Sequence, residues 1–170
     1  MQITKEQVVI LYRTVNEYQA QEKKVQEAML ANKDYKGASS AKFKSVLAKL
    51  KIVLQPEYSA IEEVGKGIGE VIKDYQEELN KLNNEYGTQD PRNGLWNFPV
   101  DKFPIYKEKA KELEVKYKDQ LDGYNQQLAD YEKFLKETVE LNFEKVSTEQ
   151  APEWLSSEVF TTLLEFGILV

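Results

Sequence analysis

The chain has 170 residues, the length of one domain, and it contains neither cysteine nor histidine. These absences remove disulfides, thiolate nucleophiles, imidazole bases and the usual ligands of zinc and di-iron sites, so catalysis would fall to Asp, Glu, Lys or Tyr with strongly shifted pKa values. Charged residues make up 31% and hydrophobic residues 41% of the chain, a balance typical of long helices with narrow apolar stripes.

The net charge of -6 is unevenly distributed along the chain. Residues 1–60 carry ten Lys or Arg against six Asp or Glu, and residues 61–170 carry thirteen against twenty-three. Only Arg13 and Arg92 are arginine, the side chain that best grips phosphate and reads bases, which argues against direct nucleic-acid binding. The basic cluster that could serve it is Lys42, Lys44, Lys49 and Lys51. Without a signal-like start or a long apolar run, we expect a soluble protein that does not enter a membrane.

The amino-terminal part, residues 1–55, is predicted to hold two helices. Thr4 and Gln7 have capping-box spacing and Ile3 and Val8 have the spacing of a hydrophobic staple, so a helix is predicted over residues 5–30. Its predicted apolar face is Val8, Leu11, Tyr12, Val15, Tyr18, Val25 and Met29. A loop that ends in a serine cap is predicted over residues 32–40.

The second helix is predicted to begin near Ala41. Its apolar positions are Phe43, Val46, Leu47, Leu50 and Leu54. We expect a break near Gln55, because Pro56 removes a backbone hydrogen bond and clashes with the preceding turn.

Residues 56–137 contain two apolar stripes with the same succession of three- and four-residue steps. The first is Ile61, Val64, Ile68, Ile72, Tyr75, Leu79, Leu82 and Tyr86, and the second is Ala110, Leu113, Tyr117, Leu121, Tyr124, Leu128, Tyr131 and Leu135. Each stripe keeps one helix face toward a partner over about seven turns. The pattern predicts a long, coiled-coil-like antiparallel helical hairpin whose connector is residues 87–104.

The outer faces of this hairpin carry charge pairs at helix-neighbour spacing, which we expect to be solvated. The pairs are Glu77 with Lys81, Glu112 with Lys116, and Glu132 with Lys136.

The connector contains two turn signals, Asp90-Pro91 and Asn93-Gly94. After them Trp96, Phe98 and Val100 alternate with polar or small residues, and Val139, Leu141 and Phe143 alternate after the last long helix. These alternations predict a small two-stranded sheet at one end of the hairpin.

Residues 138–170 are predicted to contain this second strand and a short helix. Ser156 or Ser157 is its cap and Gly167 its end, and the face is Val159, Phe160, Leu163 and Leu164. The apolar carboxyl terminus either binds a groove on another protein or, as we expect, docks onto its own domain. The fold class is therefore mainly α, a single elongated domain over residues 1–170 in which the hairpin packs with an N-terminal helix, a small two-stranded β element and a short C-terminal helix.

The stretch EVGKGIGEV, residues 63–71, places glycine at every second position. It matches neither a dinucleotide fingerprint nor a phosphate-binding Walker loop. Three interpretations remain: close helix packing or a local distortion at Gly65 and Gly69, a flexible hinge, and ligand binding, of which we favour the first. The acidic doublets Glu62-Glu63 and Glu77-Glu78 point about 100° apart on a helix, so neither converges on one atom. We expect no catalytic residue, metal ligand or cofactor.

Five aromatic residues are candidates for binding a partner: Trp96, Phe98, Phe103, Tyr106 and Trp154. The alternative for the connector rings is that they cap the core of the hairpin itself.

The order of several short segments resembles a family of short tailed-phage proteins of unknown function. The segments are ITKEQ, KFKSVLAKL, NNEYG, an NG turn before an extended piece, VELNFEKV and LSSEVFTTLLEFGIL. The resemblance implies a phage origin and a location in the host bacterial cytoplasm or the virion, and it brings no catalytic residues. The chain departs from the family around residues 21–40 and in its long third helix.

Three functions follow from these observations. The first is a non-enzymatic phage protein, a virion or assembly accessory component, that binds a phage structural or host protein and could also form a homo-oligomer. The second is a small acidic inhibitor that binds a host defence enzyme by mimicking a polyanion from Ile61 onward, an idea weakened by the interspersed lysines. The third is an enzyme that uses carboxylates or lysine, for which Glu63 and Lys66 would be the residues to test.

Overall fold

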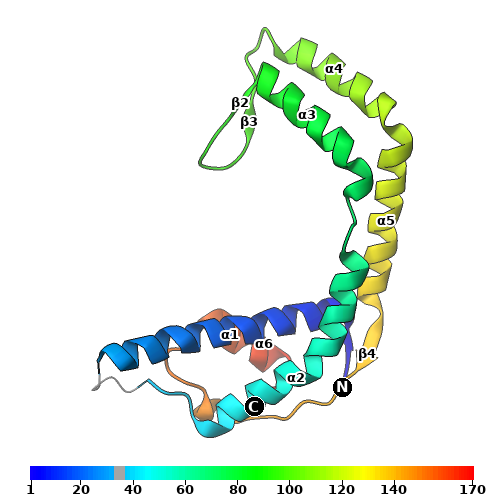
Figure 1. Cartoon of the computed structure of the whole chain (residues 1–170). Helices are drawn as coiled ribbons and strands as arrows, with labels where there is room; N and C mark the ends of the chain where they lie inside the picture. The colour runs from blue at the N-terminus through cyan, green and yellow to red at the C-terminus, as the bar shows by residue number, and fades with distance from the viewer. Residues whose placement is uncertain (33–36) are drawn as a thin grey trace. The chain divides into compact units, whose positions relative to one another are not determined.

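The computed structural model describes residues 1–32 and 37–170. Its helices are α1 (Lys5–Ala31), α2 (Ala41–Gly65), α3 (Lys73–Tyr86), α4 (Phe103–Lys116), α5 (Lys118–Lys136) and α6 (Ser157–Glu165). Its strands are β1 (Gln2–Thr4), β2 (Thr88–Gln89), β3 (Trp96–Asn97) and β4 (Thr138–Glu140), and short 3-10 turns cover Glu70–Ile72 and Thr148–Gln150. The predicted mainly α class with a minor β content is confirmed (Figure 1).

The chain divides into two compact units rather than the single domain that we expected. The first unit combines residues 1–64 with 133–170, and the second is residues 65–132. We expected the parts of the chain to divide after residues 55 and 137, whereas the two units divide after residues 64 and 132. Both ends of the chain contribute to one core, a long-range arrangement that helix periodicity does not report.

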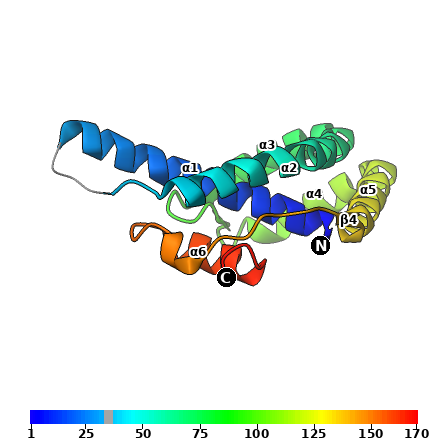
Figure 2. The same ribbon diagram turned by 90° about the horizontal axis from the view of Figure 1, so that it is seen from below.

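The first unit is organised around α1, α2 and α6 (Figures 1 and 2). The predicted capping box is present, because Gln7 N donates to Thr4 Oγ1 at 3.1 Å and Thr4 N donates to Gln7 Oε1 at 2.9 Å. The buried core is Ile3, Val8, Leu11, Tyr12, Val15, Tyr18, Phe43, Val46, Leu47, Leu50, Leu54, Ile61, Val146, Val159, Leu163, Ile168 and Leu169. Five of the seven predicted face positions of α1 are in this core, whereas Val25 and Met29 are half-buried.

The loop predicted over residues 32–40 falls partly on residues 33–36, which lie outside the described residues. Its serine cap is present at Ser40, whose Oγ accepts a hydrogen bond from Phe43 N at 3.1 Å.

The predicted break near Gln55 is wrong, because α2 continues through Pro56 to Gly65. Buried Leu54 and Ile61 fix the helix on both sides of the proline, and Tyr58 stacks on Tyr12 with 3.9 Å between ring centroids. Pro56 has no N–H, so the carbonyl oxygen of Ile52 loses its helical hydrogen bond. Both residues are exposed, so water can donate a hydrogen bond to that oxygen. Packing energy thus outweighs the local cost of proline.

Among the residues that the structure describes, two small antiparallel sheets occur in place of the single predicted one. β1 pairs with β4, with Ile3 opposite Val139, and β2 pairs with β3, with Gln89 opposite Trp96. The segments around Trp96 and Val139 are therefore strands, but the pairing of one with the other is wrong. Strands of two or three residues contain too little pattern to specify their partners.

The carboxyl-terminal helix agrees with the prediction. Ser156 is the cap, with its Oγ accepting from Val159 N at 3.3 Å, and Gly167 follows the helix with φ 69°. Ile168 and Leu169 are buried in the core of the first unit, and Val146 N donates to Ile168 O at 2.8 Å. The apolar end thus docks onto its own unit. Leu164 is the exception on the predicted face, since it is exposed.

The second unit contains the antiparallel pair α3 and α4, joined by the connector (Figure 1). Tyr106 contacts Asn83 and Lys116 contacts Glu78, so the end of one helix lies beside the beginning of the other. Each predicted long helix is interrupted. The first ends at Gly65, before Gly67 and Gly69 adopt left-handed conformations, and the second bends at Tyr117, where φ is -106° and ψ is 19°.

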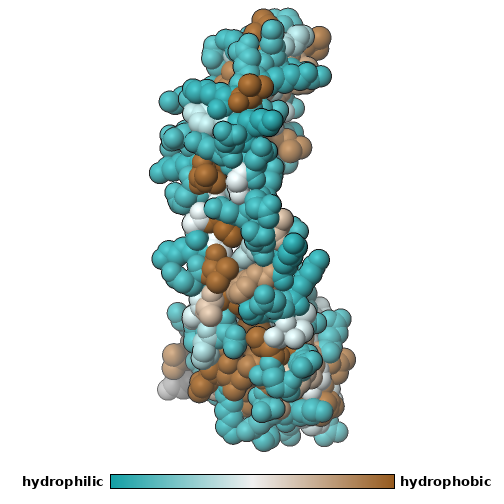
Figure 3. All heavy atoms as spheres, turned by 90° about the vertical axis from the view of Figure 1, so that its right-hand side faces the viewer, coloured by the Kyte–Doolittle hydropathy of each residue, from teal (hydrophilic) through white to brown (hydrophobic). Residues whose placement is uncertain are grey.

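Within the described residues, no helix combines the length and apolar character needed to cross a bilayer. On the face drawn in Figure 3, hydrophobic residues are exposed in separate groups among hydrophilic ones, the broadest of them in the lower part of the view.

Candidate functional site

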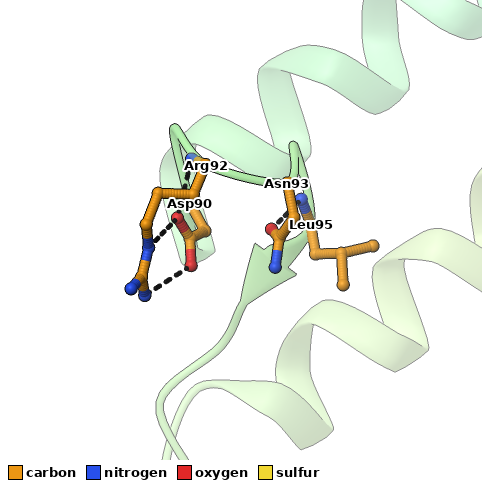
Figure 4. Close-up of polar contacts among 4 residues, drawn as sticks. All are labelled: Asp90, Arg92, Asn93 and Leu95. Carbon is orange, nitrogen blue, oxygen red and sulfur yellow. Dashed lines mark hydrogen bonds and ion pairs between the residues drawn. The ribbon is translucent and has the colours of Figure 1, made fainter.

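The connector between α3 and α4 is an ordered structure. The ribbon of β2 and β3 is closed by hydrogen bonds from Asp90 N to Leu95 O and from Gly94 N to Asp90 O, both 2.8 Å long. Gly94 has φ 72°, a conformation that favours glycine, and Leu95 N donates to Asn93 Oδ1 at 3.0 Å (Figure 4). Both predicted turn signals therefore lie in one closed loop.

Asp90 and Arg92 fix the tip of this loop (Figure 4). Asp90 Oδ1 accepts hydrogen bonds from Arg92 N at 2.9 Å and from Arg92 Nε at 3.3 Å, and Oδ2 is 3.2 Å from a terminal guanidinium nitrogen. The hydrogen bond from the Arg92 side chain, followed by that from its backbone, lowers the pKa of Asp90. The Arg92 side chain remains 88% exposed and so can contact another molecule.

Three aromatic rings of the connector and α4 contact one another. The centroids of Phe98 and Tyr106 are 4.0 Å apart in a stacked arrangement, and Phe103 lies 6.0 Å from Phe98 and 6.4 Å from Tyr106. Tyr106 Oη donates to Oδ1 of buried Asn83 at 2.6 Å. Burial raises the pKa of Tyr106.

Gly87 lets the chain pass under Phe98. A Cβ at this position would lie 2.7 Å from Phe98 Cε1 and 2.9 Å from the backbone oxygen of Asn97. Phe98 and Tyr106 therefore close the end of the α3–α4 hairpin, as in the alternative interpretation of these rings.

Four apolar side chains of this region, among them Phe103 of the ring cluster, are exposed. The exposed fractions are 65% for Leu95, 92% for Val100, 45% for Phe103 and 49% for Ile105. We call these four residues the connector patch. Leu95, Val100 and Ile105 were not among the candidates, because sequence spacing does not distinguish an exposed apolar loop residue from a core residue.

The remaining candidates are not brought into one site. Trp96 is half-buried in β3. Trp154 belongs to the first unit, where its indole N–H donates to Gly37 O and its ring stacks on Tyr18 at a centroid distance of 6.0 Å. Trp154 therefore supports the edge of the first core, and only the connector aromatics lie together.

Gly65 and Gly69 have different environments. A Cβ at Gly65 would lie 2.9 Å from Tyr131 Oη, so glycine permits a close approach of α5. A Cβ at Gly69 would make an ordinary 3.9 Å contact with Tyr124, but its φ of 102° is unfavourable for other residues. The glycines therefore combine a close approach with a distorted turn.

Within residues 1–32 and 37–170, no group of three or more Asp or Glu is placed to hold a metal ion. No protein-family model matches the chain, and neither a curated protein nor a solved structure does.

Proposed function

We propose that this protein is a non-enzymatic, phage-encoded binding protein that attaches to another protein through the connector patch. The observation that carries the proposal is the exposure of Leu95, Val100, Phe103 and Ile105 on the connector and the first turn of α4, where hydrogen bonds and a ring cluster hold the backbone. An ordered apolar surface loses little conformational entropy on binding, which favours affinity. Exposed Arg92 adds a side chain that is enriched at binding hot spots.

The phage origin in this proposal is supported by the resemblance in segment order. The resemblance implies a location in the virion or the host bacterial cytoplasm, and we propose a role as a virion or assembly accessory component. The partner is then a phage structural protein or a host protein.

Polyanion mimicry, the second function considered, receives less support from the second unit. Lys116 pairs with Glu78 at 3.0 Å, so a lysine neutralises one of the carboxylates that a mimic would display. Lys109 lies over the ring of Tyr86 on the same helix pair. A mimic would have no use for these cations.

The binding proposal is tested with the double variant Leu95→Ser/Val100→Ser. Both side chains are exposed, so the change should leave the fold intact while removing apolar contact area. We expect affinity capture from phage-infected cells to recover a specific partner with the parent protein and to lose most of it with the variant. The control is Leu30→Ser, which changes an exposed apolar residue of the first unit.

Equal recovery by the parent and the double variant would refute binding through the connector patch. The variant Trp96→Ala distinguishes a binding role of the indole from a structural one. Loss of partner with an unchanged melting temperature supports a binding role, and unfolding shows that the indole is structural.

A further inference from the structure

The facing apolar stripes of α3 and α4 are only half-covered. Residues that are half-exposed on these helices are Tyr75, Leu79, Leu82, Tyr86, Tyr106, Ala110, Leu113 and Tyr117. Among the described residues of the second unit, Ile72 is the only buried hydrophobic residue. A pair of helices covers such a seam from one side only, whereas a four-helix bundle encloses it.

One side of this seam is a groove with a volume of about 440 Å³. Its lining is Glu78, Lys81, Leu82 and Glu85 from α3 and Lys109, Glu112, Leu113 and Lys116 from α4. The apolar residues of the groove are therefore the two leucines, and six charged side chains surround them.

The charges on the two helices have complementary order. The charged residues that α3 contributes to the groove are, in chain order, Glu78, Lys81 and Glu85. Those that α4 contributes are Lys109, Glu112 and Lys116, at the same spacing. In the antiparallel pair, Glu78 therefore meets Lys116, at 3.0 Å. Within the described part of the chain, Lys81, Glu85, Lys109 and Glu112 form no direct ion pair, although Lys109 lies over the ring of Tyr86 and is also attracted by Glu85 and Glu112. All four residues are exposed, so they can also contact a partner.

We propose that the groove binds the α3–α4 hairpin of a second copy of this chain, giving an antiparallel four-helix bundle. The charge order selects the arrangement. With a two-fold axis parallel to the helices, α3 faces α4 of the other copy, and Lys81 meets Glu112 while Glu85 meets Lys109. With α3 facing α3 in antiparallel fashion and Lys81 opposite Lys81, Glu78 would lie within one residue of the position opposite Glu85, so like charges would face one another.

This interface is separate from the connector patch, so it does not rest on the proposed function. Burial of Leu82 and Leu113 from both copies supplies its apolar centre, and the charge pairs at its rim set its register.

The experiment measures the mass of the full-length protein by sedimentation equilibrium over a range of concentrations. The variants are Lys81→Glu and Glu112→Lys, which change exposed residues and so should not disturb the helices. In a homodimer, each variant places like charges opposite one another at two symmetric positions. We expect a parent dimer and about tenfold weaker association for each variant, the effect of two modest ion pairs.

Mixing the two variants distinguishes pairs between chains from pairs within a chain. In the mixed dimer, the carboxylate introduced by Lys81→Glu meets the ammonium introduced by Glu112→Lys, and the unchanged Lys81 meets the unchanged Glu112. We expect the mixture to regain parental association, although each chain still carries its own like-charged pair. The matched controls are Lys111→Glu and Glu108→Lys, which make the same charge changes at exposed sites outside the groove and should leave the dimer unchanged.

A parent protein that stays monomeric up to its solubility limit would overturn the proposal, as would a mixture that associates no better than its components. Leu113→Glu provides a second test and should give a monomer whose helix content, checked by circular dichroism, matches the parent. A dimer that survives Leu113→Glu would also exclude this groove. The Leu95→Ser/Val100→Ser variant should remain a dimer, which separates the failure of this inference from failure of the binding proposal.

Discussion

Gly87 has no side chain, and this leaves room for the ring of Phe98 and the backbone of Asn97. Its φ of -138° is open to any residue, but a Cβ would lie 2.7 Å from the ring of Phe98 and 2.9 Å from a backbone oxygen. The tight contact involves backbone as well as a ring, so small side-chain motions cannot relieve it. The closed end of the hairpin therefore depends on this single missing methyl group.

Gly87→Ala should separate Phe98 from Tyr106 and destabilise the protein by about 1–3 kcal/mol, the usual cost of overpacking. Urea denaturation measures the stability, and the chemical shifts of the Phe98 ring protons report the stacking. Gly123→Ala is the control, because nothing lies within 4 Å of its Cβ inside α5, and it should stabilise by about 1 kcal/mol. Equal effects of the two substitutions would contradict the packing at Gly87.

Tyr18 shows how the first core affects a single titratable group. Burial raises its pKa to about 12, although a hydrogen bond to Ser39 at 3.1 Å acts in the opposite direction. The folded state thus favours the neutral phenol. The contribution of Tyr18 to the stability of the fold is complete below the pKa that this tyrosine has in the unfolded chain, near 10. This contribution is lost as the pH rises toward 12.

We expect Tyr18 to give the latest tyrosine ionisation step in an ultraviolet absorbance titration, and Tyr18→Phe to remove that step. The Tyr18→Phe variant should also lose less stability than the parent between pH 10 and pH 12. A titration in which the late step persists in Tyr18→Phe would assign the raised pKa to another tyrosine.

Among the elements, α1 and α6 were predictable because their signals are local. The capping box at Thr4 and the cap at Ser156 act within one helical turn, and both are present. The course of α2 was not predictable, since Pro56 is a local stop signal that the packing of Leu54 and Ile61 overrides. The helix break at residues 65–69 was masked by a hydrophobic stripe that continues through the glycines.

Pro56→Ala should stabilise the protein by about 2 kcal/mol. The substitution restores a helical hydrogen bond and removes a clash, gains that exceed the lost restriction of the unfolded chain. Thermal or urea denaturation measures the change. Pro91→Ala, in the exposed connector turn, is the control and should give no comparable gain. Destabilisation by Pro56→Ala would indicate that α2 is interrupted at this point.

At the scale of the whole molecule, the core of the first unit joins segments from both ends of the chain. Leu163 of α6 and Leu169 of the carboxyl-terminal segment are buried with Val8 of α1 and Leu47 of α2. The second unit buries one hydrophobic residue, Ile72, among its described residues. The apolar free energy of folding is therefore concentrated in the first unit.

Adjacent leucines of α6 test this core. Leu163 is fully buried and Leu164 is 47% exposed, so Leu163→Ala should cost about 2–5 kcal/mol and Leu164→Ala about 1 kcal/mol or less. The free energy of unfolding in urea gives both values. Similar costs for the two neighbours would show that α6 does not bury its Leu163 face.

Local patterns in the chain were sufficient for the mainly α class, the limits of α1 and α6, and the turns of the connector, because capping, periodicity and turn chemistry act over a few residues. Contacts between distant residues decided the rest. They joined residues 1–64 with 133–170, paired β1 with β4 and β2 with β3, carried α2 through Pro56, and placed Trp154 against Tyr18. They also left Phe98 half-buried and Val100 exposed, because the burial of an apolar residue depends on what packs around it.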